Sequence, residues 1–283
     1  MKILLSFLLS VCTMLSLEAQ SLGSMVTASG GEIRHNGKQI GSGTLLYHQN
    51  NIFLVTAKHV IEKQFEDKLT YRFFDTGKQN DFGSTIEINL ERSDTNEFLF
   101  FSDSYDLALI HIGFSLPQKG QDKEQIHLYD IAKYSNYTKP VQSFTTNRIW
   151  LYDDLVLGID IYTLGFPSEL ERSNDTRISM VKGIVSGFYS DGRIKCQLPV
   201  YGGNSGGPVF VYSNSSPEEY GGKNIIIGSK SAYLIGVITD FVAYTDSAIS
   251  QRGSGLVLTT NSGFSKVEPI GRVIDMIQDI LSK

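Results

Sequence analysis

The stretch from Tyr201 to Pro208, Tyr-Gly-Gly-Asn-Ser-Gly-Gly-Pro, decides how the rest of this sequence is interpreted. Glycine permits backbone angles that other residues resist, so this run can turn sharply and leave the Ser205 side chain clear. A substrate carbonyl could then approach the amides of Gly203 and Ser205, and two amides aimed at one point form an oxyanion hole. Ser205 is therefore a candidate nucleophile that needs a base and an orienting group. The alternative is a glycine-rich turn with a solvated serine.

His59 is the best candidate for the base. It follows the apolar run 52–55 and stands in Thr-Ala-Lys-His-Val, where small residues ahead of the ring allow it to lie in the wall of a cleft. The sequence has five histidines, and the other four are placed less favourably. Two flank turns and look exposed, one lies inside a predicted strand, and one belongs to a polar segment: His35, His48, His111 and His127.

Asp106 is the candidate orienting group. It opens the apolar run Asp-Leu-Ala-Leu-Ile, and an acid at the mouth of such a strand must be solvated or paired, because burying a lone charge is costly. Asp103, in Ser-Asp-Ser, is a rival. We favour Asp106 because its strand would carry it inward, whereas Asp103 lies in a polar turn.

These groups occur in the order His, Asp, Ser, and in this the chain resembles the chymotrypsin-like (trypsin-like) serine peptidase superfamily. The matching segments are 56–59, 106–109 and 203–208. Gly-Phe-Pro at 165–167 and an apolar C-terminal helix are similar to the bacterial branch that includes glutamyl endopeptidases and the HtrA group. We expect no PDZ module to follow the helix. The resemblance implies an enzyme, a serine endopeptidase, with His59 as base, Asp106 as its partner and Ser205 as nucleophile.

The strand pattern indicates an all-β fold. Short apolar runs separated by turn signals predict barrels or sandwiches, and Asn36-Gly37 predicts a hairpin. Apolar residues at helical spacing predict one helix over about 269–282. The resemblance implies a double β-barrel within a peptidase domain, 21–283, with six strands in each barrel and the active site between them. Its expected parts are barrel one, a connector and barrel two, at about 26–120, 115–148 and 149–265.

The N-terminus predicts export. Residues 1–20 have a positive start, an apolar stretch too short for a typical membrane span, and small residues after it, which is typical of a signal peptide. An uncleaved anchor is the alternative, and bulky Val11 disfavours a lipoprotein built on Cys12. Removal of the signal leaves Cys196 alone, so no internal disulfide can form; this suits a bacterial secreted or periplasmic protein. The net charge of −5 gives no basic patch for nucleic acid, and nothing predicts membrane association after cleavage.

Substrate specificity is the least determined property. The resemblance places the substrate pocket along three segments, so we expect these residues to line it: Pro199, Gly202, Thr239, Asp240, Phe241 and Gly255. No cluster has the spacing of metal ligands, and we expect neither metal nor cofactor, with a protein or peptide as substrate. Asn204 stands where trypsin-type enzymes have an aspartate that binds a newly cut N-terminus, which suggests that no such activation is needed. A non-catalytic binding or adhesion protein and an esterase are the alternative functions.

Overall fold

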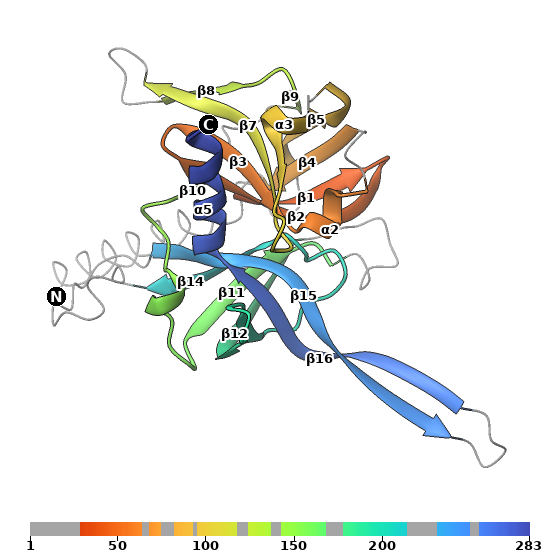
Figure 1. Ribbon diagram of the computed structural model, residues 1–283. Helices are drawn as coiled ribbons and strands as arrows, with labels where there is room; N and C mark the ends of the chain where they lie inside the picture. Colours follow the sequence, from red (N-terminus) through yellow and green to blue (C-terminus); the bar gives the residue numbers. More distant parts are fainter. Residues whose placement is uncertain are drawn as a thin grey trace, which may run out of the picture.

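The computed structural model consists mainly of β-strands in two sheets, with a helix at the C-terminus (Figure 1). The second sheet lies below the first in this view, and helix α5 runs alongside both. The structure describes nine segments: residues 29–63, 68–74, 82–92, 95–117, 124–136, 143–167, 178–213, 231–249 and 255–283. The predicted signal peptide lies outside the described residues.

The first sheet contains ten strands, which in order across the sheet run β6-β7-β3-β2-β1-β4-β5-β9, with β8 beside β7 and β10 beside β2. The strands are β1 (Gly30–His35), β2 (Lys38–His48), β3 (Asn51–Thr56), β4 (Lys68–Phe74), β5 (Phe82–Asn89), β6 (Leu99–Phe101), β7 (Ala108–Pro117), β8 (Glu124–Leu128), β9 (Ala132–Asn136) and β10 (Phe144–Thr145). Three of these strands fall within the predicted connector. The sheet therefore includes part of the chain that its polar sequence assigned to a loop.

Local sequence explains the first hairpin. Asn36 and Gly37 have φ of 49° and 76°, the positive values that a tight two-residue turn needs and that these two residues tolerate. The turn pairs β1 with β2 in antiparallel register. Apolar side chains on the inner face, among them Ile33, Leu45 and Leu54, are at most 1% exposed and form the core of this sheet.

The second sheet is a closed six-stranded barrel in the order β11-β12-β13-β16-β15-β14. Its strands are β11 (Asp160–Gly165), β12 (Ser179–Phe188), β13 (Ile194–Gln197), β14 (Pro208–Ser213), β15 (Ser231–Ile249) and β16 (Gly255–Pro269). The architecture confirms the predicted chymotrypsin-like double β-barrel. The prediction of six strands holds for this barrel and is wrong for the first sheet, which gains strands from the connector.

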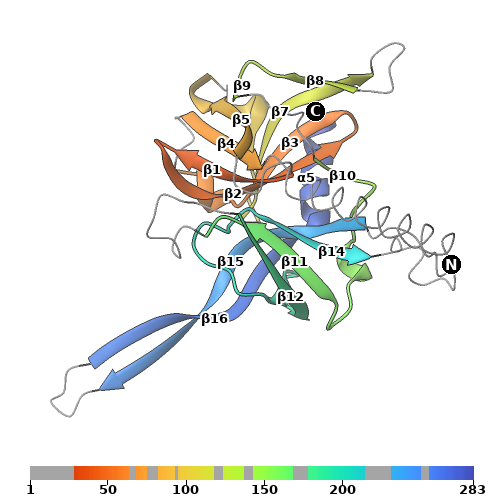
Figure 2. The same ribbon diagram turned by 180° about the vertical axis from the view of Figure 1, so that it is seen from behind.

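Strands β15 and β16 continue beyond the barrel as a two-stranded ribbon, which Figures 1 and 2 show projecting away from both sheets. β15 pairs with β14 only as far as Val237, and β16 pairs with β13 only from Phe264 to Val267. Outside those limits the two strands pair with each other. We call residues 243–249 and 255–261 the arm. The sequence predicted short strands separated by turns, so the length of β15 and β16 was not expected.

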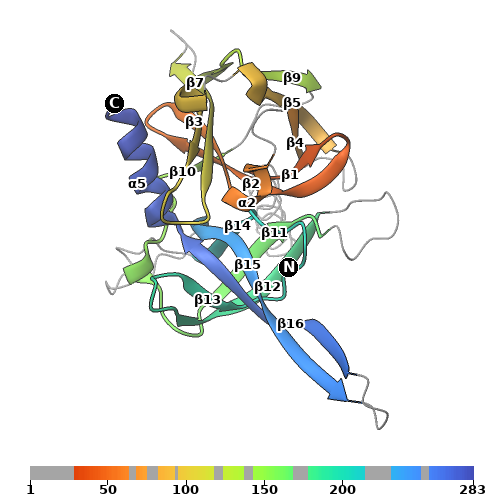
Figure 3. The ribbon, with the colours of Figure 1, turned by 45° about the vertical axis from the view of Figure 1, so that its right-hand side comes forward.

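The predicted C-terminal helix is present as α5 (Ile270–Leu281), which begins directly after Pro269. Its buried residues Ile270, Val273 and Ile277 join a cluster that also contains side chains from both sheets. Figure 3 shows α5 crossing from one sheet to the other. The other helices with bounds in the described segments are short: α2 (Lys58–Ile61), η1 (Leu90–Arg92), α3 (Thr95–Phe98) and η2 (Tyr152–Asp154). None of the helices in the described part of the chain has the length and apolar character to cross a membrane.

Candidate active site

The Ser205 loop joins β13 to β14 and is shaped by its glycines. Gly203 and Gly206 have φ of 97° and 88°, in the left-handed region that side chains disfavour. The turn is closed by hydrogen bonds from the Asn204 amide to the Tyr201 carbonyl, 3.0 Å, and from the Gly207 amide to the Asn204 carbonyl, 2.9 Å. The Ser205 side chain is thereby held at the surface of the loop, where it lines a cavity.

Strand β2 of the first sheet holds this loop of the second. The Ser42 amide donates to the Ser205 carbonyl at 2.8 Å, and the Ser42 hydroxyl donates to the Gly203 carbonyl at 2.7 Å. The Thr44 hydroxyl donates to the Gly206 carbonyl at 3.0 Å. A Cβ at Gly206 would lie 2.0 Å from the Ser42 carbonyl oxygen, so the approach requires glycine. We call this contact between β2 and the Ser205 loop the seam.

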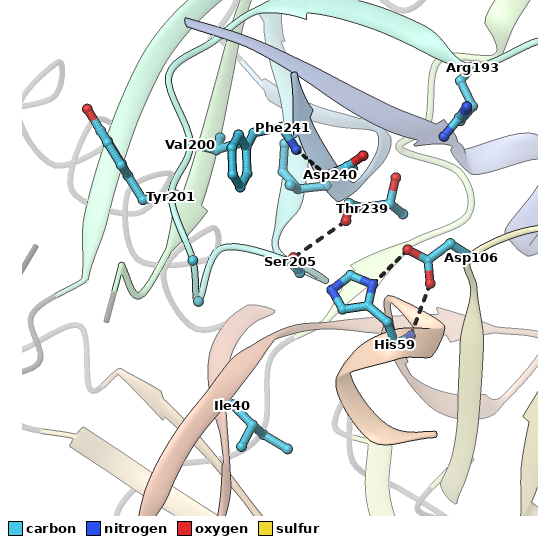
Figure 4. Close-up of a pocket in the computed structure, with 13 residues that line it drawn as sticks. Ile40, His59, Asp106, Arg193, Val200, Tyr201, Ser205, Thr239, Asp240 and Phe241 are labelled. Carbon is cyan, nitrogen blue, oxygen red and sulfur yellow. Dashed lines mark hydrogen bonds and ion pairs between the residues drawn. The ribbon is translucent and has the colours of Figure 1, made fainter. Parts of the chain in front are cut away.

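His59 and Asp106 form a hydrogen-bonded pair at the cavity. His59 lies in α2 directly after β3, and its ring Nδ1 is 2.7 Å from one carboxylate oxygen of Asp106. The His59 backbone amide donates to the other oxygen at 3.0 Å. A carboxylate with these two contacts fixes the orientation of the ring and leaves Nε2 for another partner. Figure 4 shows the pair beside Ser205.

The turn that carries Asp106 is itself held by Ser102 and Lys58. The Ser102 hydroxyl accepts hydrogen bonds from the amides of Ser104 and Tyr105, at 3.3 Å and 3.1 Å. The Lys58 ammonium donates to the Ser102 carbonyl at 3.0 Å, which ties the turn to the helix of His59. The second acidic residue of this turn, Asp103, is exposed. Of the two candidate acids, the structure places Asp106 against the imidazole.

The contact between His59 and Asp106 raises the pKa of the histidine and lowers the pKa of the aspartate. The hydrogen bond from Asp106 raises the pKa of His59 above 6.5, with burial opposing and the charges of Asp106, Asp240 and Glu62 reinforcing the rise. For Asp106, burial alone would raise the pKa, but hydrogen bonds from the side chain and backbone of His59 outweigh it and lower the pKa below 3.8. The carboxylate is thus charged at neutral pH, and the imidazole gains a proton more readily than a free histidine.

Two backbone amides at the nucleophile are available to a ligand. Within the described segments, the amides of Gly203 and Ser205 donate to no other protein group. The Ser205 hydroxyl lies 3.5 Å from the carbonyl oxygen of Thr239, at the limit of a hydrogen bond. An unpaired pair of amides beside a serine hydroxyl is the arrangement that binds the oxygen of a tetrahedral intermediate.

The cavity that contains these groups has a volume of about 520 Å³ and is lined from both sheets. It brings together all three residues of the predicted triad and four of the six predicted substrate-pocket residues: His59, Asp106, Ser205, Gly202, Thr239, Asp240 and Phe241. Pro199 is exposed and lies outside the lining. Gly255 pairs with Ile249 at the far end of the arm, away from the cavity, because β16 is much longer than its sequence suggested.

Asp240 forms an ion pair with another residue of the chain. Lys266 donates to one of its carboxylate oxygens at 2.8 Å, and the Phe241 amide donates to the other at 2.8 Å. The sequence left open whether Asp240 attracts a basic substrate side chain or points to solvent. In the structure it forms a half-exposed ion pair at the cavity wall.

Arg272, in the first turn of α5, connects three segments behind the site. It forms an ion pair at 2.5 Å with Glu268, whose side chain is 3% exposed. It donates to the carbonyl of Asp191, and its guanidinium lies 4.0 Å from the ring centroid of Tyr105, the residue before Asp106. The helix is thus in contact with the turn that carries the catalytic candidate Asp106.

The other histidines lie elsewhere. His111 stacks on Phe53 and is buried, which lowers its pKa to about 4. His48, expected to be exposed, is 7% exposed and contacts the Thr146 hydroxyl at 3.1 Å. His35 contacts Asn36 at the first hairpin. Cys196 is buried in β13, and burial raises the pKa of its thiol to about 12.

Comparison with known families and structures decides the classification. A sequence model described as a trypsin-like peptidase domain matches residues 41–215, more than half of the chain and all three candidate residues. The chain belongs to this family. No curated protein sequence matches it significantly.

Solved structures agree on the fold of this trypsin-like peptidase. An HtrA-type protease with a decapeptide has a TM-score of 0.51 and 15% identity, covering 94% of this chain and 67% of that one. Human heparin binding protein has a TM-score of 0.51 and 12% identity, covering 92% and 94%. A serine endoprotease from Yersinia pestis has a TM-score of 0.50 and 14% identity, covering 94% of this chain and 67% of that one. The chain spans 63% to 67% of the length of the HtrA-type proteases it matches.

Sequence reasoning missed the residues that support the site. Ser42 and Thr44 alternate with glycines just before the apolar residues Leu45 and Leu46, and that alternation is the only local signal for the seam. Lys266 and Arg272 carry no such signal, because their partners Asp240 and Tyr105 lie in separate segments of the sequence.

Proposed function

We propose that this protein is an exported serine endopeptidase that hydrolyses peptide bonds with His59, Asp106 and Ser205. The observation that carries the proposal is the opening of one cavity onto all three side chains and two unpaired amides. Together they supply a nucleophile, a base with a fixed ring and a binding site for developing negative charge. The proposed reaction needs no further acid, base or metal ligand from another side chain.

The proposed mechanism starts with neutral His59, whose Nε2 takes the Ser205 proton as the oxygen attacks the substrate carbonyl carbon. The carbonyl oxygen becomes an oxyanion and accepts hydrogen bonds from the amides of Gly203 and Ser205. Asp106 stabilises the imidazolium. His59 then gives its proton to the leaving amine, and the C–N bond breaks. Water attacks the acyl-enzyme with His59 again as base, which releases the acid and restores Ser205.

The shape of the cavity supports cleavage within a chain. Its lining includes Ile40 from β2 on the His59 side and Phe241 from β15 on the other, so a polypeptide can extend in both directions from Ser205. Export is supported by the N-terminal sequence alone, and a bacterial source is supported by the single cysteine left after signal removal.

Activity without a further N-terminal cut is part of this proposal. Asn204 is 1% exposed and its amide side chain fits against Gly165, where a Cβ would come within 2.8 Å of it. A neutral side chain in this place cannot form an ion pair with a new N-terminal ammonium. Protein lacking only its signal peptide should be active, and inactivity relieved by a second cut would contradict this.

The test is digestion of a peptide library with purified protein that lacks residues 1–20, with Ser205→Ala as the control. We expect cuts inside peptides by the wild type and none by the variant. Mass spectrometry of the products also identifies the residue before each cut. Turnover of small esters without any peptide cleavage would indicate an esterase, and absence of both would indicate a binding protein.

A further inference from the structure

The peptide group between Gly203 and Asn204 is hydrogen-bonded at both ends. Its N–H, on Asn204, donates to the Tyr201 carbonyl at 3.0 Å within the Ser205 loop. Its C=O, on Gly203, accepts from the Ser42 hydroxyl at 2.7 Å across the seam. The second sheet therefore supplies one of these two bonds and the first sheet supplies the other.

This peptide group is joined directly to the residues whose amides are unpaired. The Gly203 amide is linked to it through the two backbone torsions of Gly203, of which φ is 97°. On the other side comes Asn204, whose carbonyl accepts from the Gly207 amide at 2.9 Å and leaves the Ser205 amide for a ligand. Turning the peptide group would therefore change the direction of the Gly203 amide relative to the Ser205 amide.

The loop cannot fix this orientation through its own conformational preferences. Gly202 and Gly203 are adjacent, and glycine populates positive and negative φ about equally. Ser42 supplies a constraint from outside the loop: it is 1% exposed, and its backbone amide also donates to the Ser205 carbonyl at 2.8 Å. Figure 4 shows Ile40 of the same strand on the first-sheet side of Ser205.

The second hydroxyl of the seam binds a different part of the loop. Thr44 is fully buried and donates to the Gly206 carbonyl at 3.0 Å. The Gly206 amide already donates to the Ile238 carbonyl at 2.7 Å, so it is not one of the unpaired amides. The two hydroxyls make the same kind of hydrogen bond, but only that of Ser42 reaches the peptide group beside the Gly203 amide.

We propose that Ser42 is a positioning residue of the oxyanion hole, whose hydroxyl holds the Gly203–Asn204 peptide so that the Gly203 amide faces the cavity. This inference rests on the proposed function. Ser42 acts through that amide, which stabilises the charge that develops on the substrate carbonyl oxygen. The oxyanion hole of the second sheet is complete only when the first sheet is packed against it, so activity depends on the docking of the two sheets.

The first test compares Ser42→Ala with Thr44→Val in protein that lacks residues 1–20, on a peptide that the wild type cleaves. Each substitution removes one buried hydroxyl of the seam. Complete loss of an oxyanion donor costs about 10²- to 10³-fold in kcat, so a donor that is only misplaced in Ser42→Ala should cost about 10- to 100-fold. KM should stay within about threefold, because the lost interaction is made in the transition state.

The matched control separates this role from a general loss of stability. Thr44→Val should lower the midpoint of denaturant unfolding about as much as Ser42→Ala does, since both leave a carbonyl without its donor. Its kcat should fall by less than about threefold. A loss of kcat in Ser42→Ala no larger than that in Thr44→Val would overturn the proposal, and so would a change in KM alone.

Ser42→Cys is the second variant and replaces Ser42→Ala if that protein does not fold. A thiol occupies the place of the hydroxyl but is only a weak hydrogen-bond donor. The same direction of change in kcat is expected, and a kcat equal to that of the wild type would overturn the proposal.

The second test uses a peptide aldehyde that carries the sequence before the preferred cut. The Ser205 oxygen adds to the aldehyde carbon, the Ser205 proton passes to His59, and the former carbonyl oxygen becomes an oxyanion like that of the transition state. Its inhibition constant should rise in Ser42→Ala by about the factor by which kcat/KM falls. The corresponding peptide alcohol has no carbonyl oxygen and should bind equally to both proteins. Equal weakening of both compounds, or of neither, would contradict the proposal.

Labelling with a fluorophosphonate tests the positioning role without peptide turnover. The Ser205 oxygen displaces fluoride from phosphorus, the Ser205 proton passes to His59, and negative charge increases on the phosphoryl oxygen. A wild type that is labelled but cleaves no peptide would reject the proposed function, while labelling that is about tenfold slower in Ser42→Ala alone would still assign Ser42 to the hole. Equal rates in the wild type, Ser42→Ala and Thr44→Val would reject the role of Ser42 and leave the proposed function standing.

Discussion

The seam and the arm extend from the same candidate active site but are held together in different ways. The seam is closed by backbone and hydroxyl hydrogen bonds between two sheets, with Ser42 and Gly206 nearly without solvent contact. The arm is a two-stranded ribbon with exposed Tyr244 and Val257. The difference indicates that the groups around Ser205 are held in a fixed geometry by both sheets, whereas the arm is held only by the pairing of its two strands.

Asp106→Asn should produce the largest effect, a loss of about 10³- to 10⁴-fold in kcat, because the imidazole loses its orienting carboxylate. The pH profile supplies a second readout. The proposed base is neutral His59, whose pKa is raised above 6.5, so wild-type activity should fall as the pH drops through that raised value. Without the carboxylate, the residual activity should fall at a lower pH.

The control for this variant is Asp103→Asn in the same turn. Asp103 is exposed and should leave both kcat and the pH profile unchanged. A similar loss of kcat from both substitutions would mean that activity depends on the turn as a whole and not on the hydrogen bond between Asp106 and His59.

Glycine substitutions compare the packing of the seam with that of the base of the arm. Gly206 and Gly263 have φ of 88° and 80°, so alanine introduces similar backbone strain at both, about 1 kcal/mol. At Gly206 the new Cβ also meets Ser42 and Thr56, whereas at Gly263 nothing lies within 4 Å. Gly206→Ala should therefore lower the free energy of unfolding by about 3 kcal/mol or more. Denaturant unfolding measures the difference, and equal costs would contradict a tightly packed seam.

Arg272→Gln should lower the free energy of unfolding by about 2 to 4 kcal/mol, because it leaves the buried carboxylate of Glu268 without its ion-pair partner. Thermal or denaturant unfolding measures this. Glu268→Gln combined with Arg272→Gln should recover much of the loss, since no buried charge remains. Additive losses would show that the two side chains do not stabilise each other.

A matched pair of valines gives the smallest expected effects. Val237 of β15 is fully buried in the core cluster that contains side chains of both sheets, and Val257 is 66% exposed in the arm. Val237→Ala should cost about 2 kcal/mol in unfolding free energy, and Val257→Ala less than about 0.5 kcal/mol. A large cost at Val257 would mean that the arm is covered in solution, which self-association measurements would then detect.

The same contrast separates what the sequence predicted from what it did not. The segments around His59, Asp106 and Ser205 were found because each combines a turn or strand end with a residue type that its chemistry requires. The seam was missed because Ser42 and Gly203 are distant in sequence and meet only when the two sheets pack. Gly255 was assigned to the cavity from the resemblance, which does not show how far the hairpin of β15 and β16 extends before it turns.

The most direct test of the central claim, that the three side chains act as one unit at the seam, is labelling with a fluorophosphonate followed by peptide mapping. The account predicts a single adduct on Ser205. The rate of labelling should fall strongly in His59→Ala and Asp106→Asn, whose folded state is checked by circular dichroism. No adduct on Ser205, or an adduct formed equally fast without His59, would contradict it.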